Sequence, residues 1–327
     1  MTDFIPVTPA HRARILEVWQ AAMPPEYPLN ERFLAYNLTP CAGEILAGQL
    51  AIQNGQAVGL ILASVAENNP LGWVSALAVH PVCQRQGIGS HLLKWAEAWL
   101  KEHGCQRVRL GGNLRPFFPG LPVSLKENLP FFEKRGFQSP ASQPYEYDIA
   151  RSLTDYQPLY PQTLSLYNSS AIRLSASPSV APMQPGQESD LLEFLAREYP
   201  GRWEFEAREF VRNGGRSGDY LLLWVESRVE GFCRLTLADS ERPIERFYPQ
   251  RLPPPWGQFG PLGISKAMRG RGLGGILIDA AALHLQSLGV AGCVIDWTTL
   301  VDFYGKFGFT VYNQYISLFK PLITAHP

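Results

Sequence analysis

The sequence carries no excess of charge, no long apolar run and little cysteine. Its 29 Lys and Arg residues balance 29 Asp and Glu residues, so the chain presents no net positive field to nucleic acid or to an anionic membrane. No apolar run reaches about 18 residues and the N-terminus has no apolar signal core, which predicts neither a membrane span nor export. The five cysteines are odd in number and widely spaced, as free thiols of a reducing compartment are. We therefore expect a cytoplasmic protein that binds neither nucleic acid nor a membrane.

Sequence patterns of several cofactor sites are also missing. The six histidines show no H-x-H or H-E-x-x-H spacing, so we expect no metal site. A G-x-x-x-x-G-K-[ST] loop is absent, which leaves ATP binding through a P-loop unsupported. The 327 residues, 46% of them apolar, are enough for two packed domains of ordinary size.

Two short motifs occur twice, in the same order. QRQGIG (84–89) is matched by RGRGLG (269–274), and PFFEKRGF (130–137) is matched by DFYGKFGF (302–309). The copies lie 185 residues apart at the first motif and 172 at the second, so the first half has 13 more residues between its motifs. We expect those residues in the Gly- and Pro-rich loop 111–124. The repetition indicates a duplicated domain of roughly 150 residues.

The two halves share one order of predicted elements. Each has a helix, a strand meander, a strand ending at the glycine motif, a second helix, a further strand, and a closing helix and strand. The first meander turns at Asn54-Gly55, a dipeptide typical of two-residue hairpins, and the helices after the glycine motifs cover 88–103 and 273–288. This order predicts an α/β (α+β) fold of two tandem domains, each a mixed, mostly antiparallel sheet flanked by helices.

A segment rich in Ser, Pro and Tyr separates the halves at 151–187. We place the domain boundary near residue 155, which gives domains of 1–155 and 156–327. AIRLSAS (171–177) is expected to open the second sheet, as FIPVT opens the first.

Each glycine motif predicts an anion site. Glycines let the chain turn tightly and bring backbone N–H groups against a ligand, and the start of the next helix adds a positive dipole. Arg85 in the first copy and Arg269 and Arg271 in the second add charge. Such a loop suits a pyrophosphate.

A nicotinamide site is the competing interpretation. Gly270, Gly272 and Gly275 satisfy G-x-G-x-x-G, and Asp296 follows about 20 residues later. The first copy, however, has only Gly87 and Gly89, with Leu92 where a third glycine counted from these two would fall, and a hairpin meander precedes both loops, unlike the start of a dinucleotide-binding unit. We therefore give this alternative the lower weight.

The paired pattern, Q/R-x-x-G-x-G after a strand and F/Y-x-K-x-G-F some 30–45 residues later, resembles the GNAT superfamily of acyl-CoA N-acyltransferases in both halves. The tandem layout is similar to that of the mycothiol synthases. The resemblance implies acetyl-CoA (coenzyme A) as cofactor, its pyrophosphate on the loop amides and its pantetheine along the preceding strand. The residues that it implies for cofactor binding are Leu77, Ala78, Val79, Gln84, Arg85, Gln86, Gly87, Ile88, Gly89 and Ser90 in the first half, and Leu262, Gly263, Ile264, Arg269, Gly270, Arg271, Gly272, Leu273, Gly274 and Gly275 in the second.

The resemblance also implies which half does chemistry. In that family a tyrosine at the start of the last helix commonly protonates the leaving thiolate, and the matching residues here are Tyr304 and, in the first half, Phe132. Since phenylalanine has no proton to give, the second domain is expected to be the catalyst, with Tyr304 as general acid. The first domain then binds acetyl-CoA as well or only scaffolds. Asp296 is the candidate base, and a turn-capping role for it is an equal alternative.

These inferences predict an N-acetyltransferase that acts on a primary amine of a small molecule or peptide. A non-catalytic acyl-CoA-binding sensor or scaffold is the alternative, and Tyr304→Phe separates the two. The duplication is compatible with a monomer or a homodimer. The side chains that we considered for holding the acceptor are Glu204, Glu206, Asp239 and Glu241 for a cationic amine, Arg202 or Arg246 for a carboxylate or phosphate, and Trp203 and Trp256 for a sugar.

Overall fold

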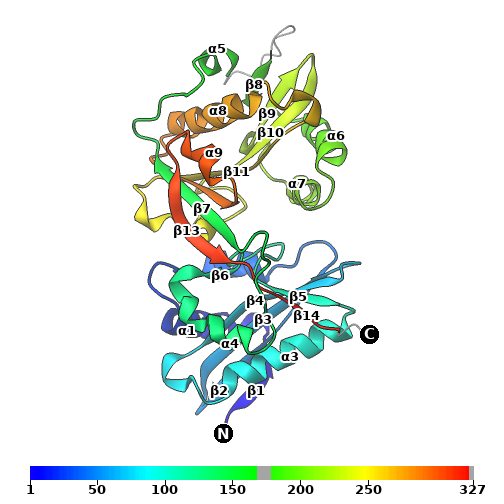
Figure 1. The fold of residues 1–327 in the computed structure, drawn as a ribbon, viewed down its shortest axis with the longest axis vertical. Helices are drawn as coiled ribbons and strands as arrows, with labels where there is room; N and C mark the ends of the chain where they lie inside the picture. The colour runs from blue at the N-terminus through cyan, green and yellow to red at the C-terminus, as the bar shows by residue number, and fades with distance from the viewer. Residues whose placement is uncertain (168–177, 324–327) are drawn as a thin grey trace. The chain divides into compact units, whose positions relative to one another are not determined.

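The computed structural model describes residues 1–167 and 178–323 and divides the chain into two compact units (Figure 1). The first unit holds Met1–Tyr147 and Asn313–Pro327, and the second holds Asp148–Tyr312. This division differs in two ways from the boundary predicted near residue 155. The second unit starts at Asp148, and the residues from Asn313 onward belong to the first unit. The strand expected at 171–177 lies outside the described residues.

Helices flank a sheet in each unit. The first unit contains α1 (Arg12–Ala22), α2 (Glu31–Leu38), α3 (Ile88–Glu102), α4 (Leu129–Glu133), β1 (Asp3–Pro6), β2 (Glu44–Gln53), β3 (Gln56–Ala66), β4 (Leu71–Val79), β5 (Arg107–Leu110), β6 (Leu121–Pro122) and β14 (Phe319–Pro321). The second contains α5 (Thr163–Leu166), α6 (Glu188–Glu198), α7 (Arg202–Arg212), α8 (Leu273–Ser287), α9 (Val301–Gly305), β8 (Ser179–Pro182), β9 (Tyr220–Val225), β10 (Arg228–Thr236), β11 (Trp256–Ile264) and β12 (Gly292–Thr298). β7 (Tyr145–Ser152) and β13 (Thr310–Ile316) each contribute residues to both units.

The two sheets repeat one connectivity. In the first unit the order is β1-β2-β3-β4-β5-β14, antiparallel except for the parallel β4–β5 pair. The strands of the second unit lie in a sheet of order β6-β13-β7-β12-β11-β10-β9-β8, in which β6 pairs with the first-unit end of β13 and β11–β12 is again the parallel pair. The β2–β3 hairpin turns at Asn54 and Gly55, both with positive φ, as the Asn-Gly dipeptide predicted. The predicted fold, two mixed sheets flanked by helices, is confirmed.

The closing strands depart from the predicted order. β14, near the end of the chain, pairs with β5 in the first unit, and most of β7 lies beside β12 in the second. β5 and β12 each pair on one side with the parallel strand before them. The backbone groups on their other side still need partners, and any antiparallel strand of suitable register can supply these. Because the chain is duplicated, that strand can come from either copy, and the repeat alone does not say which.

The helices that follow the glycine motifs differ in how fully they are buried. α3 buries one face, including Leu92, Leu93 and Leu100, and leaves the other to solvent. Along most of its length α8 is buried all round, from Leu273 to Leu285 with few interruptions. The reason is that residues 153–167 pack on its outer side through contacts with Asp279, His284 and Gln286. No helix within the described ranges is long and apolar enough to cross a membrane.

His284 gives the second unit a pH-dependent contact. The Tyr167 hydroxyl lies 2.6 Å from His284 Nδ1, and burial lowers the pKa of this imidazole below its usual 6.5. The unfolded chain therefore binds the proton more readily, and the stability that the neutral form provides is lost as the pH falls through 6.5 toward the lower folded pKa. We expect the free energy of unfolding of wild type, measured by urea titration, to fall between pH 7.5 and 5.5 by up to about 1 kcal/mol more than that of His284→Gln. Equal drops would contradict this.

Candidate active site

In the first unit, β4 separates from β5 at a bulge. The two strands pair only from Leu71 to Val74, and β4 then continues to Val79 without β5, paired with β3 alone. On its other side, Val74 pairs with Ala63 and the next partner of β3 is Ala76, so Ser75 is the extra residue. The backbone of β4 beyond the bulge is thereby free of β5, which opens a slot in the sheet.

The glycine loop lies at the far end of that slot. The Gln84 side chain donates to the Val79 carbonyl, tying the loop to the strand, and Gly87 caps α3 with a left-handed backbone at φ +86°. A Cβ built on Gly87 would meet nothing within 4 Å. The N-terminus of α3 therefore borders open space, and an anion bound there would meet its first, unpaired N–H groups.

Slot and loop form one cavity of about 800 Å³. Eight of the ten predicted first-half residues line it, namely Leu77, Ala78, Val79, Gln84, Arg85, Gly87, Gly89 and Ser90. The other two do not, because Ile88 is buried in the core and the Gln86 amide donates to the Val82 carbonyl. The longer loop of the first half also contributes to the wall, through Gly111, Phe118 and Gly120. Arg85, Lys134 and Arg135 place three cations around the glycine loop.

The second unit repeats the backbone of this site. β11 pairs with β12 only over Trp256–Gln258, and Gly272 caps α8 at φ +77°. What differs is the set of side chains that lie against this backbone.

In the second unit, Tyr160 lies at the place that corresponds to part of the first unit's cavity. Aligning the motifs places Gly275 at the position of Ser90 and Phe307 at that of Arg135, both of which line the first cavity. A Cβ on Gly275 would lie 2.2 Å from the Tyr160 ring, whose centroid is 6.2 Å from that of Phe307. The aromatic ring thus occupies the space between the glycine loop and α9.

Tyr199 covers the strand that leads to the same loop. A Cβ on Gly263 would lie 2.6 Å from its ring, and its hydroxyl donates to the Ile264 carbonyl at 2.6 Å. Met23, which follows α1 as Tyr199 follows α6, lines the open cavity of the first unit. The carbonyl at this position is bonded within the protein in both units, since that of Val79 accepts from Gln84, so what distinguishes the second unit is the Tyr199 ring over the strand.

The two predicted catalytic residues lie near one another in the second unit. Tyr304 on α9 is 7% exposed, and burial, with smaller effects of Cys233 and the Asp296 carboxylate, raises its pKa, so it stays protonated at neutral pH. Asp296 on β12 accepts a hydrogen bond from Gln258 Nε2 at 2.8 Å. In the turn that follows, the Thr298 hydroxyl accepts from the Leu300 amide.

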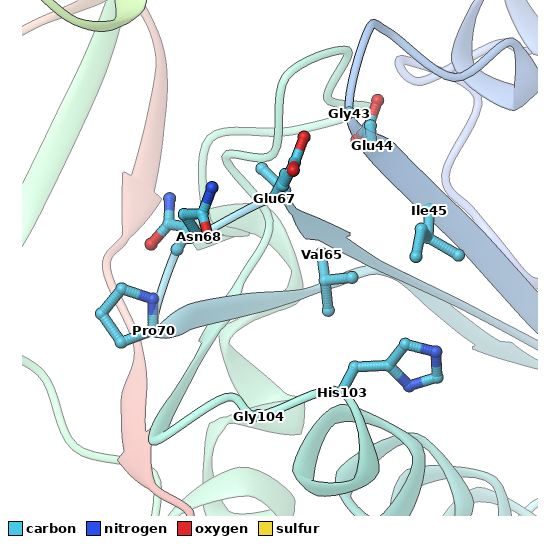
Figure 2. Close-up of a pocket in the computed structure, with 11 residues that line it drawn as sticks. Gly43, Glu44, Ile45, Val65, Glu67, Asn68, Pro70, His103 and Gly104 are labelled. Carbon is cyan, nitrogen blue, oxygen red and sulfur yellow. The ribbon is translucent and has the colours of Figure 1, made fainter.

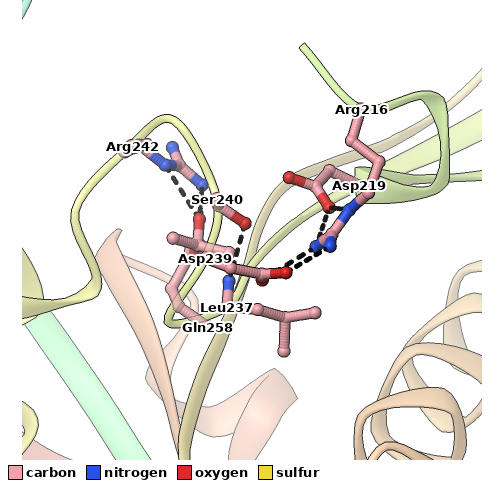
Figure 3. Close-up of polar contacts among 8 residues, drawn as sticks. Arg216, Asp219, Leu237, Asp239, Ser240, Arg242 and Gln258 are labelled. Atoms are coloured by element: carbon pink, nitrogen blue, oxygen red, sulfur yellow. Dashed lines mark hydrogen bonds and ion pairs between the residues drawn. The ribbon is translucent and has the colours of Figure 1, made fainter.

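The charged residues considered for the acceptor are engaged within the second unit. Arg202 pairs with Glu206 at 2.7 Å, and Arg216 pairs with Asp239 at 2.6 Å and with Asp219 (Figure 3). Burial opposes the charge of Glu206, but the guanidinium groups around it lower its pKa overall. Trp203 packs against Tyr199 and Phe232, and the Trp256 indole donates to the Leu252 carbonyl. These contacts give each side chain a structural role.

Figure 2 shows a second cavity of the first unit, about 570 Å³, beside the start of β2 and the end of β3. Ile45, Val65 and His103 border it, and His103 Nδ1 lies 2.8 Å from the Trp99 carbonyl. The described residues that line it include neither lysine nor arginine. It therefore lacks the charge that a phosphate-bearing ligand needs, and among the described residues no group of three or more His, Cys, Asp or Glu is arranged to hold a metal.

Comparison with known proteins gives matches over both halves. The profile of the Acetyltransferase (GNAT) family matches residues 12–118 and 189–309. An aminoalkylphosphonate N-acetyltransferase of Salmonella typhimurium is 34% identical over 71 residues, which are 20% of this chain and 46% of that enzyme. The chain thus matches about half the length of this curated relative.

Solved structures share the fold along the whole chain. The glucosamine N-acetyltransferase region of a fungal multi-domain β-N-acetylglucosaminidase superposes with a TM-score of 0.86 at 21% identity, over 98% of this chain and 38% of that one. A tandem GNAT protein from the clavulanic acid biosynthesis pathway superposes at 0.70 and 15% identity, over the full length of both chains. A GNAT protein of Sphaerobacter thermophilus superposes at 0.67 and 18% identity, over 99% of this chain and 97% of that one.

Proposed function

The chain belongs to the acetyltransferase (GNAT) family, and from this premise we propose that it transfers an acetyl group from acetyl-CoA to a primary amine of a small molecule. We further propose that acetyl-CoA binds in the first unit. One observation carries this assignment. The loop and strand of the first unit border an open cavity of about 800 Å³, whereas Tyr160 and Tyr199 lie against the same backbone in the second.

The residues of the first cavity fit this cofactor. The N-terminal amides of α3 and the side chains of Arg85 and Lys134 suit the phosphates, and the edge of β4 that β5 leaves open after Val74 offers backbone groups to the pantetheine amides. The cofactor supplies an activated acyl carbonyl, which a neutral amine can attack. The chain's part is to bind the cofactor and to stabilise the charge that develops on the carbonyl oxygen.

This proposal moves the working site from the half that the sequence favoured. The sequence placed it in the second half because Tyr304 stands where Phe132 stands in the first. We weigh the open cavity more than the tyrosine, since a general acid acts only on a cofactor that can reach it.

The acceptor is proposed as a small amine that carries polar substituents. Of the similar proteins, one is named for acetylating aminoalkylphosphonates and another for acetylating glucosamine. The test is release of free CoA thiol from acetyl-CoA in the presence of glucosamine, an aminoalkylphosphonate or a peptide N-terminus. We expect release with at least one small amine; thiol release that does not depend on any amine would contradict the proposal.

Tyr304→Phe tests which unit is the catalyst. If chemistry takes place in the first unit, we expect kcat and both KM values to stay within twofold of wild type. If Tyr304 were the general acid, kcat would fall on the order of 10²-fold or more with acetyl-CoA affinity retained. Steady-state kinetics with a saturating amine separates the two results.

A non-catalytic acyl-CoA-binding protein is the second candidate function. The observation that favours it is Phe132, because the unit with the open cavity lacks the tyrosine hydroxyl of its sister unit. Under this alternative acetyl-CoA binds in the first cavity, measurable by calorimetry, and no amine of the panel is acetylated.

A further inference from the structure

Arg135 follows α4 and lines the first cavity beside the glycine loop. Three contacts fix its guanidinium, which donates to the Phe131 carbonyl and to Ser90 Oγ, both at 2.6 Å, and whose Cζ lies 3.8 Å from the centroid of the Phe131 ring. A guanidinium has more N–H groups than these two hydrogen bonds use, and it stays charged at any ordinary pH. Arg135 therefore holds a cation, with further donors, in one place on the cavity wall.

The second unit lacks both the arginine and its serine partner. Phe307 stands at the position of Arg135. Gly275 stands at the position of Ser90, and the Tyr160 ring lies against it. The repeated fold thus forms without the arginine, which does not support a purely structural role. Arginine and serine occur together in the unit whose cavity is open, and this pairing indicates a role toward the ligand of that cavity.

The contacts around Arg135 indicate which part of the cofactor it meets. A Cβ on Gly89 would lie 3.7 Å from Val79 Cγ2 and 3.5 Å from the Phe131 ring, whose face carries the guanidinium. The contacts thus lead from the end of β4, through the glycine loop and this ring, to Arg135. With pantetheine along β4 and the pyrophosphate at the loop amides, the next part of coenzyme A is the adenosine, which carries a phosphate on its 3′ oxygen.

We propose, resting on the proposed function, that Arg135 binds the 3′-phosphate of coenzyme A and so selects acetyl-CoA over cofactors that lack this phosphate. A phosphate monoester carries about two negative charges at neutral pH and offers several acceptor oxygens to a guanidinium. Because the Arg135 side chain is already held in place, binding costs little of its conformational entropy. Stacking of adenine on the guanidinium is the competing contact, and it does not depend on the 3′-phosphate.

Calorimetric titration of wild type and Arg135→Gln with acetyl-CoA and with acetyl-3′-dephospho-CoA tests the proposal. We expect wild type to bind acetyl-CoA about 10- to 100-fold more tightly, as for hydrogen bonds to a charged group, and Arg135→Gln to bind the two alike. Arg85→Gln is the matched control, because Arg85 lines the same cavity at the loop proposed for the pyrophosphate, which both ligands carry. It should weaken both ligands and keep the preference. Arg135→Lys, which keeps the charge without the planar fork, should keep part of the preference and replaces Arg135→Gln if that variant does not fold.

The phosphorus resonances of the bound cofactor give a second readout. A phosphate monoester loses its second proton at a pKa of about 6, and a neighbouring guanidinium lowers this pKa. We expect the 3′-phosphate of acetyl-CoA to titrate at lower pH on wild type than in solution, and near the solution value on Arg135→Gln. Equal weakening of both ligands by Arg135→Gln, or a wild type without preference, would overturn the proposal. Binding of neither ligand to wild type would instead refute the proposed function.

Discussion

Gly87→Glu abolishes acetyl-CoA binding, while Gly272→Glu leaves the affinity within twofold of wild type: this is the calorimetric result that we expect. A glutamate at Gly87 places a carboxylate and two methylene carbons in the open space before α3, where the cofactor's phosphates are proposed to bind. Bulk and charge both oppose the phosphates, so we expect a loss of at least 10²-fold and a wild-type stoichiometry of one.

The two glycines are a matched pair. Each caps the helix after its glycine motif, with φ of +86° and +77°, so glutamate costs about 1–2 kcal/mol of backbone strain at either position. A difference in binding cannot then come from unequal strain. Loss of binding in Gly272→Glu alone would return the cofactor to the second unit, and a stoichiometry of two, halved by either change, would give each unit a working site.

The local backbone of both sites could be predicted from the sequence. Strict apolar periodicity placed the helix at 88–103, where the structure has Ile88–Glu102, and Gly-x-Gly placed both helix N-termini. These features depend on neighbouring residues, so a short stretch of sequence determines them. α2 was missed because it is short, and the cap that could have revealed it is a single Asn30.

The side chains that close the second site could not be predicted in this way. Tyr160 reaches α8 across 119 residues of sequence and Tyr199 reaches Ile264 across 65, and no periodicity reports such pairs. One clue was present. Asp279 is an isolated acid in the apolar run LGGILIDAAALHL, and a buried carboxylate requires donors from elsewhere in the chain. The pairing of β14 with β5 in the first unit was unpredictable for a related reason, because either copy supplies a strand of suitable pattern.

Asp279→Ala should destabilise the second unit more than any other single change considered. Asp279 is fully buried and accepts from Tyr156 Oη at 2.5 Å, from the amides of Tyr160 at 2.7 Å and Leu159 at 3.1 Å, and from Thr163 Oγ1 at 3.3 Å. Burial, and to a lesser degree the Asp279 carboxylate, raises the pKa of Tyr156, which keeps that donor protonated. Removing the carboxylate leaves buried donors without a partner, so we expect a loss of about 3–4 kcal/mol in the free energy of unfolding.

Asp302→Ala is the control for removal of a carboxylate from the same unit. Asp302 is exposed in the first turn of α9, where its effect on the helix dipole is worth at most about 1 kcal/mol. Urea unfolding gives the two free energies, and hydrogen exchange of the amides at 156–163 shows whether this segment is released, as we expect only in Asp279→Ala. Because the proposed cofactor site lies in the other unit, acetyl-CoA affinity should stay within twofold in both variants below the unfolding transition. Protected amides in Asp279→Ala would mean that ring packing against Gly275 and Phe307, and not the carboxylate, holds Tyr160 over the second glycine loop.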